Sequence, residues 1–155
     1  LKKEYNACLE LFGSVMNHNS KYFCSLFYDL EKYFGSRGNH FNLKPIRGFY
    51  FLNPPFYEDM LNASLGNMLK NLDKNKNIGY FVSLPIWDKK GRDWINKHCK
   101  ITVENKPFEL PIYDKLKKHK RLKEFNKYCK EDYQYLDYLS FRKINATSTY
   151  TFLFL

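Results

Sequence analysis

Two apolar segments that each end at proline constrain the fold of this chain more than any other feature. The first covers residues 49–52 and stops at Asn-Pro-Pro-Phe (53–56), and the second covers residues 78–84 and stops at Pro85. Proline has no N–H for a sheet ladder and fixes its own φ, so each segment is predicted to be a strand that ends there. Residues 57–72 lie between them and carry apolar residues at helical spacing. A strand, a helix and a second strand predict parallel neighbours whose carboxyl ends share one edge of a sheet.

The Asn53-Pro54-Pro55-Phe56 sequence combines groups that suit the methylation of a planar amine. Such an amine is a poor nucleophile because its lone pair is delocalised into the ring. The side-chain carbonyl of Asn53 and the backbone carbonyl of Pro54 could accept its two N–H bonds, while Phe56 stacks on the ring. In open α/β sheets, ligands bind at the edge where these residues are predicted to lie. The alternative interpretation is a Pro-Pro turn that only ends a strand.

Length and charge indicate one basic domain. The 155 residues suit a single domain spanning positions 1–155. The net charge of +10 and the pI of about 9.4 predict attraction to polyanions, and nucleic acid is the leading partner. The alternative is a lysine bias from an AT-rich coding sequence. We expect an intracellular protein of the nucleus or cytoplasm, and the composition is compatible with a viral source.

The cysteines and the N-terminus add three expectations. Cys8, Cys24, Cys99 and Cys129 are far apart, so we expect reduced, mostly buried thiols and no metal site. No segment has the roughly 20 apolar residues of a membrane-spanning helix, and the lysine-rich start is not a signal peptide, so no membrane partner is expected. Because the chain begins at Leu1 rather than Met, we expect a fragment or a trimmed domain.

The remaining segments complete the predicted fold. Apolar and charged patterns predict the following elements: a buried strand at 5–12, an amphipathic helix at 20–33, a short helix at 89–98, a strand at 99–104, a basic surface helix or flexible arm at 114–131, and closing strands at 133–141 and 149–155 that form an antiparallel pair.

A cofactor-binding site is predicted at the end of the first strand. Glu10 precedes the small residues Gly13 and Ser14, and Rossmann-like methyltransferases hold the amino-acid part of S-adenosyl-L-methionine at such a turn. Glu10 could equally be an ordinary strand residue. Phe34 and Gly35, in the Phe-Gly-Ser-Arg-Gly block, could also approach a cofactor. No G-x-G-x-x-G and no P-loop is present, which argues against dinucleotides and nucleotide hydrolysis.

Three further residues could contact a substrate. Arg37 between two glycines could meet a phosphate, Glu58 could accept a hydrogen bond from a base or ribose, and Trp87 could form a second wall opposite Phe56. The alternatives are a solvated arginine in a glycine turn, a carboxylate at a helix start and a core or rim tryptophan. The four histidines show no zinc spacing, and no catalytic role is assigned to them.

Several of these motifs resemble those of a known family. Four blocks resemble, in order and spacing, the catalytic core of the phosphorylated CTD interacting factor family of cap-specific adenosine N6-methyltransferases: Glu10 to Asn17, Tyr33 to Gly38, Asn53 to Glu58, and Pro85 to Trp87. The resemblance implies a Rossmann-like methyltransferase fold that uses S-adenosyl-L-methionine. It places Asn53 to Phe56 at the transfer site, with Glu58 and Trp87 near the substrate. It also places Phe108 and Glu109 near the cofactor. The family's WW domain is not expected in this chain.

These observations lead to one functional hypothesis and its alternatives. We expect a methyltransferase that modifies N6 of the 2′-O-methyladenosine next to the mRNA cap. RNA is the expected partner and no metal is expected, while protein partners are left open. The first alternative keeps the chemistry and changes the substrate to adenine in DNA or a glutamine amide in protein. The second is an inactive methyltransferase-like module that binds RNA or a protein.

Overall fold

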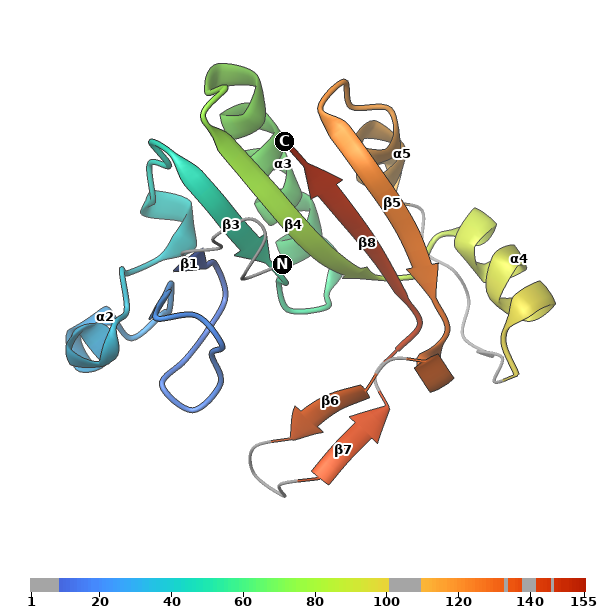
Figure 1. Cartoon of the computed structure of the whole chain (residues 1–155), viewed down its shortest axis with the longest axis horizontal. Helices are drawn as coiled ribbons and strands as arrows, with labels where there is room; N and C mark the ends of the chain where they lie inside the picture. The colour runs from blue at the N-terminus through green and yellow to red at the C-terminus, as the bar shows by residue number, and fades with distance from the viewer. Residues whose placement is uncertain (1–8, 101–109, 133, 138–141, 146) are drawn as a thin grey trace.

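The computed structural model describes residues 9–100, 110–132, 134–137, 142–145 and 147–155 (Figure 1). Its centre is a six-stranded sheet in the order β2-β1-β3-β4-β8-β5. The strands of this sheet are β1 (Leu9–Glu10), β2 (Tyr22–Phe23), β3 (Gly48–Leu52), β4 (Ile78–Pro85), β5 (Leu122–Tyr128) and β8 (Thr149–Phe154). A separate pair, β6 (Gln134–Asp137) and β7 (Arg142–Asn145), projects from one end of it.

The sheet is parallel on one side and mixed on the other. Strand β1 pairs in parallel with β2 and with β3, and β3 pairs in parallel with β4. Strand β8 is antiparallel to both of its neighbours, β4 and β5. Because β4 and β5 are both antiparallel to β8, they run in the same direction as each other. The predicted α/β class and the parallel β3–β4 pair are therefore confirmed.

Helices cover the sheet and connect its strands. The helices are α2 (Tyr28–Glu31), α3 (Glu58–Lys74), α4 (Lys89–His98) and α5 (Pro111–Lys117), with short 3-10 turns η1 (Lys32–Phe34), η2 (His40–Asn42) and η3 (Lys130–Asp132). Helix α3 links β3 to β4 and buries Leu61, Leu65 and Met68 completely, as its apolar spacing predicts. Figure 1 shows α3 and α5 on the same face of the sheet. Within the described ranges, no helix is both long and apolar enough to cross a membrane.

The mixed side of the sheet contributes a large aromatic part of the core. Every residue of β8 is buried, including Tyr150, Phe152 and Phe154. The ring of Phe125 on β5 lies 4.9 Å from that of Phe152 and 5.2 Å from that of Tyr150. The Tyr150 hydroxyl donates to Asp88 Oδ1 at 2.8 Å. Burial and this carboxylate raise the pKa of Tyr150, so the phenol stays neutral.

The helix predicted over residues 20–33 is wrong. Residues 22–23 form β2, and helix is confined to Tyr28–Glu31. The apolar stripe that suggested an amphipathic helix does not face the core, because Leu26 and Leu30 are 79% and 72% exposed. Phe23 instead completes the backbone hydrogen bonds of a parallel ladder beside β1. The strand expected at 5–12 is described only from residue 9 onwards, as β1.

The predictions for the C-terminal third also need correction. Residues 114–131 form neither one helix nor a flexible arm, because α5 ends at Lys117 and β5 follows as an edge strand. Charged residues on an edge strand oppose pairing with other chains, so a lysine-rich strand is physically reasonable there. The closing strands do not pair with each other, because β6 pairs with β7 and β8 pairs with β4 and β5. The strand expected at 99–104 lies mostly outside the described residues.

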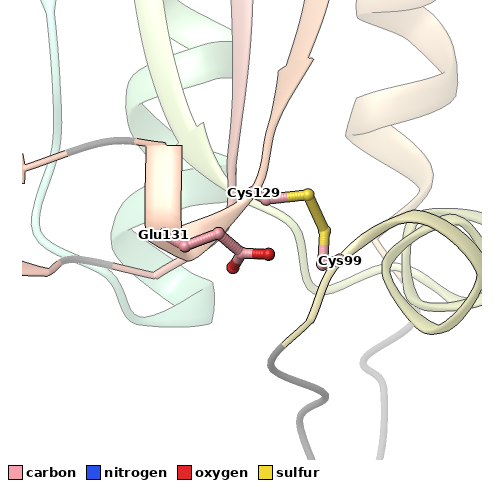
Figure 2. A group of neighbouring side chains, drawn as sticks. All are labelled: Cys99, Cys129 and Glu131. Atoms are coloured by element: carbon pink, nitrogen blue, oxygen red, sulfur yellow. A yellow bond between two sulfur atoms is a disulfide. The ribbon is translucent and has the colours of Figure 1, made fainter.

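The expectation of reduced cysteines is wrong for one pair. Cys99 follows α4, Cys129 follows β5, and the two form a disulfide of 2.07 Å (Figure 2). The spacing of 30 residues gave no sequence signal, and tertiary packing brings the Cα atoms to 5.5 Å. Glu131 lies beside the pair, and a hydrogen bond from the Lys100 N–H lowers the pKa of its carboxyl group. The Cys99, Cys129 and Glu131 ligand atoms lie within 4.8 Å of one another, but sulfurs joined in a disulfide are not thiolate ligands.

Candidate functional site

A cavity of about 860 Å³ lies at the carboxyl ends of β1 and β3. The strand order reverses at this point, because β2 lies on one side of β1 and β3 lies on the other. Such a reversal leaves a crevice outside the strand ends, where open α/β sheets usually bind ligands. The wall comes from the segments that follow β1, β2 and β3, together with η2. The volume lies within the usual range for small-molecule and cofactor sites.

The end of β1 supplies an acidic wall. Glu10 is only 6% exposed, and its Oε2 accepts the backbone N–H of Asn19 at 2.8 Å. Gly13 and Ser14 line the cavity beside it. A Cβ atom at position 13 would lie 2.9 Å from Cβ of Phe23, so the close packing of this loop on β2 requires glycine. The predicted cofactor residues of this turn therefore do lie together on the cavity wall.

A second carboxylate reaches the same wall and was not anticipated from the sequence. Glu31 ends α2, and its Oε1 accepts the backbone N–H of Val15 at 3.0 Å. Its Oε2 is shielded from solvent and has no hydrogen-bond partner among the described residues. Glu31 and Glu10 thus hold the loop after β1 from two sides. Two carboxylates on one wall favour a ligand with a positive charge.

The segment after β3 supplies a neighbouring part of the wall. Asn53, Pro54, Pro55 and Phe56 all line the cavity, as expected from the end of the strand. The Asn53 Oδ1 atom is buried and has no hydrogen-bond partner within the described part of the chain. An unpaired buried carbonyl costs about 1–3 kcal/mol, so a ligand N–H that reached it would recover that energy. This amide is therefore a candidate acceptor for a bound amine.

The other residues predicted to contact a substrate near this segment lie outside the cavity. Trp87 packs edge-on against Phe56, with ring centroids 6.0 Å apart and an interplanar angle of 78°. The two rings therefore do not form parallel walls of a slot, and Trp87 supports Phe56 from outside the cavity lining. Glu58 is an exposed residue in the first turn of α3 and does not line the cavity either. Phe108 and Glu109 lie outside the described residues.

The Phe-Gly-Ser-Arg-Gly block shapes a loop next to the main cavity rather than its wall. Gly35 and Gly38 have φ values of +107° and +85°, which favour glycine. Ser36 Oγ lies 2.6 Å from Ser25 Oγ, and this contact ties the block to the segment after β2. Phe34 is 61% exposed. Neither Phe34 nor Gly35 lines the main cavity, so the structure does not bring them to the predicted cofactor-binding site.

Arg37 lies on a second, smaller cavity. Its guanidinium stacks 4.0 Å from the centre of the Tyr22 ring. This cavity of about 470 Å³ is also lined by Lys44, and it shares Leu26 and Asn39 with the main cavity. Two cations beside the main cavity could meet a phosphate of a longer ligand.

Part of the basic segment 114–131 holds the fold together. Arg121 donates to the backbone carbonyls of Leu72, Asn75 and Ile78, where α3 ends and β4 begins. A cation at this position also complements the helix dipole. Lys117 binds Asp88 Oδ2 at 3.0 Å. Arg121 and Lys117 are therefore used within the fold. Fewer cations of this segment are available to a polyanion than the net charge of the chain suggests.

Sequence reasoning missed the aromatic end of the cavity. His40 from η2 is 4% exposed and lines the cavity beside Phe12 and Phe41. The only local signal was its place after the glycine loop, and nothing in the spacing indicated that it would be buried. Cys24 also lines the cavity, but burial raises the pKa of its thiol to about 11, so it stays protonated.

The fold and the cavity together define an α/β domain with a cavity at the carboxyl ends of its parallel strands. Its wall has carboxylates from the β1 and α2 side, and uncharged amide, imidazole and aromatic groups elsewhere. The family model described as "Phosphorylated CTD interacting factor 1 WW domain" matches residues 1–114, which is more than half of the chain. The chain therefore belongs to this family. The matched residues include the whole cavity wall except Gln134.

Two mammalian relatives agree with this assignment. Over 88 residues, or 56% of this chain, it is 32% identical to a mouse protein named mRNA (2'-O-methyladenosine-N(6)-)-methyltransferase. It is 31% identical to a human protein of the same name over an equal length. The aligned part spans only 12% of the length of each relative. The family predicted from the motifs is thus confirmed. The model that matches is described as the family's WW domain, which the motifs did not predict, and the assignment to a catalytic core is a separate proposal.

Proposed function

We propose that this domain binds S-adenosyl-L-methionine in the main cavity and methylates N6 of an adenosine in RNA, at or near the mRNA cap. The observation that carries the proposal is that Asn53 to Phe56 line the same cavity as Glu10, Gly13 and Ser14. The methyl-transfer motif and the predicted cofactor turn lie far apart in the sequence, yet they line one cavity.

The residues on the wall fit the proposed cofactor. S-adenosyl-L-methionine, when bound, would supply a methyl group on a positively charged sulfonium. Glu10 and Glu31 offer negative charge on the β1 side of the cavity, which suits a cationic ligand. Gly13 allows the loop to pack closely on β2 and keeps that side narrow. We propose that the second ligand donates an N–H to the buried Oδ1 of Asn53, which has no hydrogen-bond partner among the described residues.

The same residues suggest how catalysis would work. Asn53 Oδ1 and the Pro54 carbonyl would accept the two N–H bonds of the adenine amine and direct its lone pair toward the methyl group. Phe56, supported edge-on by Trp87, would stack on the base. Rate enhancement would come from positioning and electrostatics, so no strong base is required in this proposal.

The sheet supports a Rossmann-like methyltransferase fold. Parallel strands β1, β3 and β4 end at the cavity side, and the antiparallel β8 lies between β4 and β5. We propose that this arrangement is a short version of that fold. RNA as the substrate is supported by the net charge of +10 and by exposed rings on the cavity wall, at Phe41 and Tyr57, on which bases could stack. We also propose an intracellular location, where capped mRNA occurs.

Calorimetry with S-adenosyl-L-methionine tests the proposal first. We expect saturable binding to the folded chain, and absence of binding would contradict the cofactor assignment. A methylation assay would then offer capped RNA beginning with 2′-O-methyladenosine, the same RNA without its cap, and single-stranded DNA. Transfer to capped RNA alone would support the full proposal. Transfer to DNA, or to a glutamine peptide added as a fourth substrate, would keep the chemistry and change the substrate.

A binding module without activity is the second candidate. The matching family model is described as a WW domain, and the chain spans only 12% of its relatives. The second cavity, with Arg37 and Lys44, offers cations for a phosphorylated protein segment. This candidate predicts no cofactor binding but measurable, salt-sensitive binding of a phosphopeptide, which fluorescence anisotropy would detect.

A further inference from the structure

His40 differs from the other histidines of the chain in its surroundings. His18 and His98 each place Nδ1 within 2.9 Å of a backbone carbonyl, and His119 Nδ1 accepts the N–H of Arg121. Both ring nitrogens of His40 are buried, and neither has a hydrogen-bond partner among the described residues. Leaving such groups unpaired costs free energy, and proteins rarely leave them so without a reason.

Aromatic rings surround this imidazole on the cavity wall. The Phe12 ring lies 5.1 Å from the His40 ring and the Phe41 ring lies 5.0 Å from it, both tilted. Phe12 and Phe41 meet edge to face at 6.3 Å. All three residues line the main cavity. Rings at this spacing favour a flat ligand that can pack against them.

The imidazole is neutral at ordinary pH. Burial lowers the pKa of His40 to about 4. A neutral imidazole offers one N–H donor and one nitrogen acceptor. An adenine edge carries the same combination, a ring nitrogen acceptor beside an amine donor. A neutral group is also compatible with a positively charged cofactor in the same cavity.

The aromatic end lies next to the proposed transfer site. Glu10 pairs with Phe51 in the β1–β3 register, and the Leu11 N–H continues the ladder to the Phe51 carbonyl. Phe12 comes two residues after Glu10, and Asn53 comes two residues after its partner Phe51. The segments that follow β1 and β3 therefore leave the sheet next to each other. His40, packed on Phe12, therefore lies close to the segment that begins with Asn53.

We infer that His40 hydrogen-bonds an adenine ring bound in the main cavity, with Phe12 and Phe41 packing around that ring. This inference rests on the proposed function and adds a specificity-determining residue to it. Adenine occurs both in S-adenosyl-L-methionine and in the acceptor nucleotide, and the two sources share the chemistry that His40 would recognise. The experiment separates them.

The test uses the whole chain with three substitutions. His40→Phe keeps a flat ring and removes both nitrogens, and His40→Gln restores a donor and an acceptor. His98→Phe is the matched control, because His98 is exposed and does not line the cavity. Calorimetry would measure the affinity for S-adenosylhomocysteine and for a short capped RNA that begins with 2′-O-methyladenosine.

We expect His40→Phe to weaken one of these ligands by about three- to tenfold, the usual effect of one neutral hydrogen bond. His40→Gln should recover part of that loss, and His98→Phe should bind both ligands normally. Weaker binding of S-adenosylhomocysteine would show that His40 contacts the adenine of the cofactor. Weaker binding of the RNA, with unchanged binding of S-adenosylhomocysteine, would show that it contacts the acceptor base.

Two results would overturn the inference, and they have different meanings. If folded His40→Phe binds both ligands as tightly as the native chain, His40 is only a packing residue, and the proposed function is unaffected. If the native chain binds neither ligand, the proposed function fails and the inference fails with it. Thermal melting of each variant shows whether it is folded. A purely structural role would change the melting temperature and leave the affinities of the folded protein equal.

Discussion

The two sides of the sheet differ in how they are held together. On the β8 side, two buried phenols are paired within the protein: Tyr113 donates to the Pro85 carbonyl at 2.9 Å, and Tyr150 donates to Asp88. Asp88 also binds Lys117. These bonds link α5 and β8 to the end of β4. This side of the molecule stabilises the sheet with its own side chains.

The cavity side has less regular structure. Strand β2 is two residues long, and large apolar residues such as Leu26 and Leu30 are exposed. His40 and Asn53 Oδ1 are buried without partners in the described structure. The comparison indicates that aromatic packing and these bonds stabilise the β8 side, and we expect the polar atoms of the cavity wall that lack partners in the described structure to meet a ligand. Mutations on the two sides should therefore have different effects.

The largest expected effect is on activity, from Asn53→Ala. Removing the proposed amine acceptor should lower methyl transfer to capped RNA by about 100- to 1000-fold, because such groups act mainly in the transition state. The melting temperature should change little, since Oδ1 has no partner in the described structure. Single-turnover methylation and circular dichroism would measure both. Asn62→Ala on the exposed face of α3 is the control, and near-normal turnover by Asn53→Ala would show that the site is misassigned.

The second prediction concerns the disulfide on the β8 side. Replacing Cys99 and Cys129 by serine should lower the free energy of unfolding by about 3–4 kcal/mol, because the bond closes a loop with a sequence separation of 30. Urea denaturation without reductant would measure this. Addition of reductant should bring the native chain to the stability of the variant. The affinity for the cofactor should stay constant. If reductant does not change the free energy of unfolding of the native chain, this prediction is wrong.

The third prediction compares two helical glycines. A Cβ at Gly91 in α4 would collide with the Tyr150 hydroxyl, Ile86 and Asp88, so Gly91→Ala should cost about 2–3 kcal/mol. A Cβ at Gly66 in α3 would meet nothing within 4 Å, so Gly66→Ala should stabilise by about 0.5–1 kcal/mol. Thermal and urea denaturation would measure both. Equal effects of the two substitutions would contradict the tight packing of the β8 side.

The smallest expected effect is a pH dependence from His40. Its pKa is about 4 when folded and near 6.5 when unfolded. Between these values the unfolded chain binds a proton that the folded chain does not, so stability falls as pH decreases through this window. The native chain should lose up to about 2 kcal/mol more than His40→Phe between pH 6.5 and 5. Urea denaturation at several pH values measures the difference, and parallel curves would exclude a buried neutral imidazole.

Local sequence signals predicted the central part of the fold well. Pro54 and Pro85 end β3 and β4 because proline cannot continue a ladder, and α3 follows from apolar spacing that faces the sheet. The same signals failed where exposure was decided by distant parts of the chain. Leu26 and Leu30 have helical spacing but face outward, and the lysine-rich β5 became a strand because β8 offered it an antiparallel partner.

The candidate site was predictable only in part for the same reason. Glu10, Gly13 and Asn53 lie on the cavity wall because strand ends place them there, and strand ends can be read from sequence. Glu31 and His40 reach the same cavity from turns whose path depends on Gly35, Gly38 and packing on β2. Phe34 and Glu58, although close to motif residues in sequence, lie outside it.

The sequence by itself determined where the parallel strands end, which residues stand at those ends and to which family the chain belongs. Only the tertiary structure decided which of these residues share a cavity, which lysines and arginines hold the fold together, and that Cys99 and Cys129 meet. The physical reason is that proline, glycine and apolar periodicity act on neighbouring residues. Burial of His40 and pairing of the cysteines depend on contacts between residues far apart in the chain.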